Sequence, residues 1–181
     1  MLAIASTWRT SLALSFALTL TSAFAASGCG SGHPDLTPDA VRSIPAGTGT
    51  GSAASGTYTF RRVTTACSGR CSGSVSGFPF SVCDVGDSTD DSATVTQTDG
   101  VLVIDISDTP SLYRGGIDAD GSYDVGAYAT EFGGDVEITA RSEGVFEAGG
   151  FVGTARSRTR GVVEMQSIDC IGSYDVSSLA L

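Results

Sequence analysis

Apolar and polar residues alternate with a period of two along most of the chain after Gly56, as is typical of β-strands. The helical period of 3.6 is not visible in this part of the sequence. Asp-Gly and Gly-Gly pairs separate the alternating runs, and such pairs favour tight turns between antiparallel strands. The pattern predicts an all-β domain over residues 56–181.

The turn at Asp99-Gly100 allows the register of one hairpin to be predicted. If these two residues form the turn, Val95 faces Ile104 on the neighbouring strand. One face of the hairpin is then largely apolar, while the other face carries mostly polar residues.

Two later turns keep the same face apolar. A three-residue turn after Ile117 pairs that residue with Tyr123, and a turn further along pairs Phe146 with Phe151. For the last two strands, at about 150–167 and 170–179, the predicted inward residues are Phe151, Ala155, Val163, Met165, Gly172, Tyr174 and Val176.

The chain thus contains eight predicted strands, joined mostly by short turns into an antiparallel up-and-down meander. Such a meander exposes two edges unless the sheet closes on itself, so a closed barrel is the predicted architecture. A β-sandwich is the alternative.

The first 28 residues have the organisation of an export signal. Arg9 is the only charged side chain before the apolar run at 11–20, and small residues follow at 21–28. The apolar run is too short, and too rich in Ser and Thr, for a membrane-spanning helix. We therefore expect residues 1–28 to act as a signal peptide.

The motif at 26–29, Ala-Ser-Gly-Cys, resembles the lipobox of bacterial lipoproteins. The resemblance implies that Cys29 is acylated, becomes the mature N-terminus and attaches the protein to a membrane of the cell envelope. Gly30 stands where lipoproteins kept in the inner membrane tend to carry Asp, which implies the outer membrane. Cleavage after Ala25 is the alternative, and it would give a secreted or periplasmic protein.

Residues 29–55 are rich in Gly, Pro, Ser and Thr and have little apolar periodicity. This composition predicts a flexible tether between Cys29 and the β-domain at 56–181.

The predicted β-domain contains four cysteines, at Cys67, Cys71, Cys83 and Cys170. In an exported protein, four cysteines favour two disulfides. Their spacing also allows a zinc site, but the only His of the chain is His33 in the predicted tether, so we expect no metal.

Barrel closure favours one of the three possible pairings of the four cysteines. It brings the first strand beside the last one, antiparallel, with Cys67 near Cys170. Cys71 and Cys83 would then close the loop at 67–91, which is long for a compact domain unless something clips it.

The charge of the chain limits its partners. There are 20 acidic and 10 basic residues, which give a formal net charge of -10. An acidic domain is repelled by nucleic acid, so nucleic acid is not an expected partner. The expected membrane contact is through the N-terminal lipid, and the sequence does not constrain the oligomeric state.

No catalytic centre or cofactor is predicted. With one His and no Lys in the chain, the β-domain offers no base for a nucleophilic Ser or Cys. Paired carboxylates can hydrolyse glycosides, but Glu137, Glu143 and Glu164 fall on the predicted outward face. We expect a non-enzymatic function, with a glycosidase-type hydrolase as a lesser alternative.

Two acidic segments could bind calcium or form solvated turns. In Asp118-Ala-Asp-Gly-Ser122 the spacing fits a hairpin turn better than a calcium loop. The other segment is the long loop, with Asp84, Asp87, Asp90 and Asp91, where a soluble loop is the simpler interpretation.

Arg156, Arg158 and Arg160 alternate along one predicted strand and so project from one face. They either balance Glu137 and Glu143 on the outer surface or form an anion-binding stripe for a phosphate, carboxylate or glycan.

The predicted barrel is similar to those of the lipocalin and avidin families. Residues 56–58, Gly-Thr-Tyr, stand where those families often carry Gly-x-Trp at the start of the first strand. The resemblance is architectural and implies no function by itself. An eight-stranded barrel is either filled or has room for one small ligand, so we expect a binding module whose interior takes a small apolar or amphipathic molecule or whose arginine stripe takes an anionic one. The alternative is a protein-interaction or inhibitor module that uses the loop at 67–91.

Overall fold

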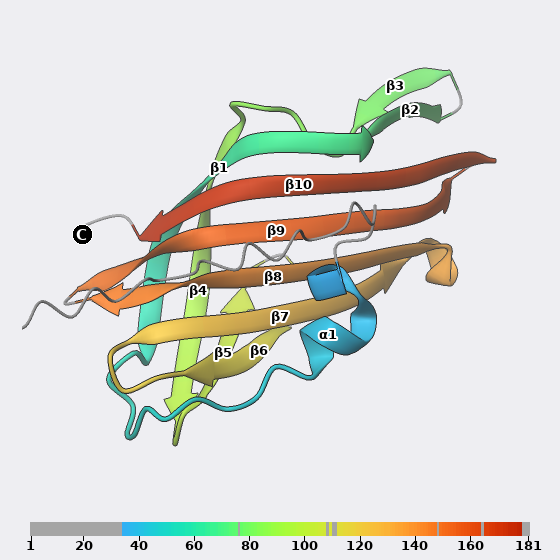
Figure 1. The fold of residues 1–181 in the computed structure, drawn as a ribbon. Helices are drawn as coiled ribbons and strands as arrows, with labels where there is room; N and C mark the ends of the chain where they lie inside the picture. The colour runs from blue at the N-terminus through green and yellow to red at the C-terminus, as the bar shows by residue number, and fades with distance from the viewer. Residues whose placement is uncertain are drawn as a thin grey trace, which may run out of the picture. The chain divides into compact units, whose positions relative to one another are not determined.

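The computed structural model describes residues 34–75, 77–107, 109, 112–147, 149–163 and 165–178. Eight antiparallel strands close into one barrel in the order β1-β10-β9-β8-β7-β6-β5-β4 (Figure 1). The predicted all-β meander and its closure are confirmed, and the sandwich alternative is excluded.

The barrel strands are β1 (Gly56–Arg70), β4 (Ser88–Thr98), β5 (Val101–Ile106), β6 (Leu112–Ile117), β7 (Ser122–Glu131), β8 (Val136–Glu147), β9 (Gly150–Val163) and β10 (Gln166–Ser178). A separate hairpin inside the predicted long loop consists of β2 (Ser72–Val75) and β3 (Phe78–Ser81). The short helical elements are η1 (Pro34–Leu36), α1 (Pro38–Arg42) and η2 (Phe132–Gly134). None of the helices among the described residues is long and apolar enough to cross a membrane.

The predicted hairpin registers are confirmed. Val95 pairs with Ile104, Ile117 with Tyr123, and Phe146 with Phe151. Asp99 and Gly100 both have positive φ, 46° and 79°, as a type I′ turn requires. The register was predictable because turn chemistry and side-chain alternation agree on the same pairing.

One of the predicted inward residues is wrong. Phe151 and Val176 are buried, but Met165 is 96% exposed. β9 ends at Val163, and Met165 has a φ of 66° in the turn before β10, so the alternation of the strand does not extend to it.

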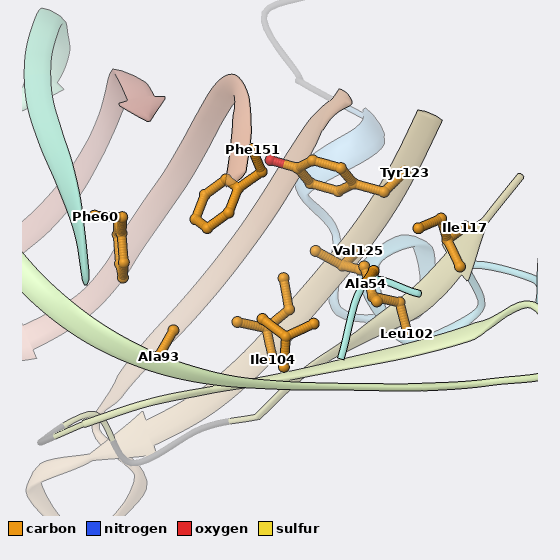
Figure 2. Close-up of a cluster of buried hydrophobic side chains, with 10 residues drawn as sticks. Ala54, Phe60, Ala93, Leu102, Ile104, Ile117, Tyr123, Val125 and Phe151 are labelled. Atoms are coloured by element: carbon orange, nitrogen blue, oxygen red, sulfur yellow. The ribbon is translucent and has the colours of Figure 1, made fainter. Parts of the chain in front are cut away.

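Aromatic side chains fill one half of the barrel interior. Figure 2 shows Phe60, Tyr123 and Phe151 reaching into a common space, where Phe151 lies 5.8 Å from Phe60 and 6.4 Å from Tyr123 between ring centroids. Tyr58 and Phe146 pack against the same rings. The cavity beside Phe60, Tyr123 and Phe151 is only about 40 Å³, so these rings form a packed core. Tyr58 and Phe146 also line a second pocket of about 410 Å³, together with Ala54 and Gln97.

Residues 50–55 close the barrel end formed by the turns at 99–100, 118–121 and 149, which we call the closed end. Ala54 is buried there, and its N–H donates to Gln97 Oε1 at 2.9 Å. Gln97 is 5% exposed, and its backbone N–H donates to Ser55 Oγ. The buried amide is thus hydrogen-bonded, as buried polar groups usually are. The opposite end, with the turns at 132–135 and 163–166 and the segment 67–87, is the open end.

The predicted flexible tether is wrong from Pro34 onward. Leu36 and Val41 are each 1% exposed, and the Leu36 carbonyl accepts a 2.8 Å hydrogen bond from Thr139 Oγ1 on β8. Gly126 permits this close packing, because a Cβ at that position would lie 2.3 Å from the Val41 carbonyl oxygen. The folded unit therefore begins well before the predicted boundary at residue 56.

All four cysteines of the barrel unit form disulfides, but the predicted pairing is wrong. The bonds join Cys67 to Cys83 and Cys71 to Cys170, instead of Cys67 to Cys170 and Cys71 to Cys83.

A bulge in β1 explains the difference in pairing. The register between β1 and β10 shifts between Thr64 and Ala66, so Cys67 lies opposite Gly172, two residues from Cys170. β1 also continues to Arg70. Cys71, the next residue, therefore lies close to Cys170 on β10.

Candidate functional site

The inward face of β1 changes from apolar to polar toward the open end. Tyr58 and Phe60 point into the packed core, and the alternation then places Arg62 and Thr64 on the same inner face. Arg62 borders both the small apolar cavity and a larger polar cleft. It therefore marks the boundary between the filled half and the open half of the barrel.

The polar cleft at the open end has a volume of about 320 Å³. Most of the side chains that line it carry hydroxyl groups, namely Thr64, Ser81, Thr89, Ser157, Thr159 and Tyr174. Arg62 supplies a positive charge at its inner boundary, and Asp84 and Asp87 lie on its wall. Such a cleft is at the lower end of the size range of small-molecule sites.

The Arg62 guanidinium is held loosely. Its Nη2 donates to Thr89 Oγ1 at 3.2 Å, and Asp91 Oδ2 lies 3.7 Å away, beyond hydrogen-bond distance. The Thr89 hydroxyl in turn donates to Asp91 at 3.1 Å. A guanidinium has five N–H donors, and among the described residues only Thr89 takes a hydrogen bond from this one. The side chain is 39% exposed, so an anion can reach it from the cleft.

Two tyrosines flank Arg62. Its guanidinium carbon lies 5.5 Å from the ring centre of Tyr174, whose hydroxyl is 3.1 Å from Ser157 Oγ. Tyr113 lies on the apolar side, where burial raises the pKa of its phenol and the positive charge of Arg62 opposes that rise. Tyr113 is therefore neutral at physiological pH.

The Cys67–Cys83 disulfide holds the outer wall of the cleft, which is formed by residues 82–87. Two backbone hydrogen bonds also fix this wall to β1, from Gly86 N–H to the Thr64 carbonyl at 2.9 Å and from Thr64 N–H to the Asp87 carbonyl at 2.8 Å. The disulfide and these two hydrogen bonds together fix the position of the cleft wall.

The structure does not bring the four aspartates of the predicted long loop together. Asp90 forms a two-point contact with Arg61, at 2.7 and 2.9 Å, and these hydrogen bonds lower the pKa of its carboxyl. Asp91 faces Arg62 instead, while Asp84 and Asp87 stay on the cleft wall. Within the described part of the chain, Cys71, Cys83 and Cys170 have sulfurs close enough to share a metal, but all three are disulfide-bonded.

The aspartates near Gly121 stabilise a hairpin turn. Asp118 Oδ1 accepts hydrogen bonds from the N–H and hydroxyl of Thr48. Asp120 accepts from the N–H and hydroxyl of Ser122, and these hydrogen bonds lower the pKa of its carboxyl. Gly121 has a φ of 88°, so this segment is the predicted turn.

The arginine stripe lies on the outer surface, and neighbouring acids bind Arg156 and Arg158. Arg158 makes a two-point contact with Asp169 at 2.8 Å, which lowers the pKa of that carboxyl, and Arg156 forms an ion pair with Asp35. Arg160 pairs across the sheet with Glu137. The structure thus places the three arginines where the outer-surface interpretation requires them.

The glutamates considered for glycoside hydrolysis also contact outer-surface residues. Glu143 lies 3.1 Å from Arg141 Nε, and Glu137 accepts a 3.4 Å hydrogen bond from the Tyr128 hydroxyl. Glu164, like Cys29 and His33, lies outside the described residues.

Sequence reasoning missed Arg62, although a signal was present. The alternation that predicted Tyr58 and Phe60 on one face of the first strand also places Arg62 on that face. A charged residue at an inward position is the kind of departure from the apolar pattern that marks a candidate site.

Comparisons with known proteins found no family model, no curated protein and no solved structure that matches this chain. The resemblances to bacterial lipoproteins and to the lipocalin and avidin barrels therefore stay predictions.

Proposed function

We propose that this chain is a lipid-anchored protein of the bacterial cell envelope whose barrel binds a small polar molecule with one anionic group. Arg62 binds the anionic group, and the surrounding hydroxyls hydrogen-bond the rest of the molecule. The observation that carries the proposal is the incompletely bonded guanidinium of Arg62 beside a hydroxyl-lined cleft of about 320 Å³.

Of the two cavities that Arg62 borders, only the polar cleft is large enough for a ligand. The apolar cavity of about 40 Å³ holds little more than a few water molecules, because aromatic rings fill that half of the barrel. Asp84 and Asp87 line the outer part of the polar cleft, so a polyanion would be repelled while a single carboxylate or phosphate beside Arg62 is not. Monocarboxylates, including hydroxy and amino acids, and monophosphates fit this description.

The side chains that line the cleft favour ligand binding over catalysis. Among the described residues that line it there is neither His nor Glu, and its two wall carboxylates are exposed. The position in the envelope rests on the export signal and the lipobox-like motif at 26–29. Acylation of Cys29 and location in the outer membrane are parts of the proposal, and the intact mass of the exported protein tests the acylation.

A thermal-shift series tests the binding. The probes are lactate, glycine and inorganic phosphate, with uncharged decanol as an apolar contrast, and the variants are Arg62→Gln and, as a matched control, Arg114→Gln on the outer face of β6. At a hundred times its Kd, a ligand stabilises the fold by about 2.7 kcal/mol. For a domain of this size, that is a rise in Tm of about 5–10 °C.

The proposal predicts that at least one small anion raises the Tm of the wild type and of Arg114→Gln, and that the rise is lost in Arg62→Gln. A rise with decanol alone, no rise with any probe, or a rise that persists in Arg62→Gln would contradict it.

A further inference from the structure

Exposed apolar side chains concentrate at the open end of the barrel. Among the described residues, eight large hydrophobic side chains are exposed, and all but Val152 lie at this end or in the loops attached to it. They are Phe78, Val82, Val85, Leu112, Phe132, Val162 and Met165. The turns at the closed end instead carry Asp99, Asp118 and Asp120. The two ends of the barrel therefore differ in polarity.

Three of the four most exposed of these side chains lie on neighbouring hairpin turns, and the fourth, Val85, lies on the cleft wall. Phe78 follows the β2–β3 turn and is 76% exposed, Phe132 is on the β7–β8 turn and is 66% exposed, and Met165 is on the β9–β10 turn and is 96% exposed. In Figure 1 these turns lie together on the right side of the barrel. We call Phe78, Phe132 and Met165 the apolar tips.

Hydrogen bonds hold these turns beside one another. The Gln166 side chain accepts from Ser74 N–H and donates to Ser74 Oγ, both at 3.0 Å, which joins the β9–β10 turn to β2. Val162 N–H donates to the Asp135 carbonyl at 3.1 Å, which joins β9 to the β7–β8 turn. The apolar tips therefore belong to one continuous surface.

Two of the apolar tips occupy strained backbone positions. Phe132 has a φ of 51° and Met165 a φ of 66°, in the left-handed region that bulky residues rarely adopt. Gly or Asn would fit either position at lower conformational cost, and neither side chain gains burial in the barrel. Large apolar residues at such positions indicate a contact outside the barrel.

The short segment between Cys29 and Pro34 favours a bilayer as the partner that the apolar tips contact. Asp35 and Leu36 are fixed on β9 and β8 through Arg156 and Thr139. Five residue steps separate Cys29 from Pro34, which span at most about 18 Å. The β7–β8 turn lies five residues along β8 from Thr139, or about 16 Å. An acylated Cys29 would therefore hold the barrel close enough to the membrane for the turns to reach it.

We propose that the apolar tips enter the interface of the bilayer that holds the acyl chains of Cys29, so that the open end and its cleft face the membrane. The inference rests on the lipid anchor of the proposed function. Interfaces favour exposed Phe and Met side chains over the aspartates of the closed end, and this preference selects the orientation.

Single tryptophan reporters test the proposal. Trp8 is the only Trp of the chain and precedes Cys29, so the mature protein contains none. The exported, acylated protein is reconstituted in phosphatidylcholine vesicles as the variants Phe132→Trp, Met165→Trp and, as a matched control, Val152→Trp, which is 48% exposed on β9 near the closed end. Fluorescence is measured with and without brominated acyl chains, and intact mass reports acylation of Cys29.

The proposal predicts blue-shifted emission and quenching by brominated lipid for Phe132→Trp and Met165→Trp, but not for Val152→Trp. An acylated protein whose reporters at 132 and 165 stay in water would overturn the membrane contact and leave the anchor standing. A mature N-terminus without acyl chains would overturn both. A blue shift that needs no vesicles and grows with protein concentration would assign the tips to a protein partner and also overturn the membrane contact.

Discussion

The guanidinium carbon of Arg62 lies 5.5 Å from the centre of the Tyr174 ring, across the contact between β1 and β10. A cation that close to an aromatic ring gains about 0.5–1 kcal/mol at a partly exposed site. The ring therefore restricts the position of the guanidinium without using its N–H donors, which remain available to an anion in the cleft.

This contact predicts a graded effect of substitutions at Tyr174. Tyr174→Leu removes the ring and should weaken binding of the best anionic probe about 2–5-fold, the equivalent of the cation–π energy. Tyr174→Phe keeps the ring and removes only one of the hydroxyls that line the cleft, so it should lose less affinity than Tyr174→Leu. Isothermal titration of the three proteins measures the difference, and equal loss in Tyr174→Phe and Tyr174→Leu would show that the ring is not what positions Arg62.

The disulfides should differ in their contributions to stability and binding. Cys71–Cys170 closes a sequence separation of 99 residues and Cys67–Cys83 one of 16. Chain-entropy estimates predict losses of about 4.7 and 3 kcal/mol in the free energy of unfolding when each pair is changed to Ser. The Cys67→Ser/Cys83→Ser variant should also lose stabilisation by the anion, because residues 82–87 are then free to leave the cleft.

Urea unfolding of the two double variants checks the order, and peptide mapping of the intact protein checks the pairing. Recovery of a peptide that joins Cys67 to Cys170 would contradict the structure. Anion binding that survives in Cys67→Ser/Cys83→Ser would show that the wall is not required.

The packed N-terminal segment predicts that residues before the first strand stabilise the barrel. Leu36→Ala should lower the free energy of unfolding by about 2–4 kcal/mol, because the side chain is buried against β8. Gly126→Ala should also destabilise, since its Cβ would collide with the Val41 backbone. Val152→Ala is the exposed control and should change stability by less than about 0.5 kcal/mol. An unchanged denaturation midpoint for Leu36→Ala would restore the tether interpretation.

Stability should fall at alkaline pH because of the buried tyrosines. Burial raises the pKa of Tyr113 and Tyr123, so the folded state retains these protons at a pH where the unfolded chain releases them. Their contribution is complete below about pH 10, the ordinary tyrosine pKa, and is lost as the pH rises through the higher folded-state values.

Urea midpoints at pH 8 and pH 11 measure this dependence. Tyr113→Phe should show a smaller fall between the two pH values than the wild type, whereas Tyr128→Phe on the outer face should fall as the wild type does. An identical fall in all three proteins would mean that the phenol of Tyr113 does not control the alkaline limit.

Local rules were sufficient for the hairpins of this barrel. A two-residue turn at Asp99-Gly100 and the alternation of Val95 and Ile104 each specify the same register, so the sequence contains that information twice. The disulfide pairing depended on a bulge after Thr64. The sign of it in the sequence is that Tyr58 and Tyr174 fall on different faces if Cys67 lies directly opposite Cys170 without a bulge.

The packing of the N-terminal segment could not be predicted from the sequence, and the cleft could be predicted only in part. Few apolar residues in 34–55 suggested a tether, yet Leu36 and Val41 are buried because glycines in the sheet let the segment approach closely. Arg62 was within reach of sequence reasoning through strand alternation, but its loose bonding and the adjoining cleft depend on β4, β10 and the wall at 82–87.

The most direct test of the account observes Arg62 itself. The chain contains ten basic residues, all Arg, and the mature protein would keep nine of them, so the Nε–Hε region of a nitrogen–proton correlation spectrum is simple enough to assign with an Arg62→Lys variant. The account predicts that titration with lactate, glycine or phosphate shifts the Arg62 signal saturably, while the ion-paired Arg158 stays in place. An Arg62 signal that does not move, or moves only linearly together with the surface arginines, would contradict the proposed anion site.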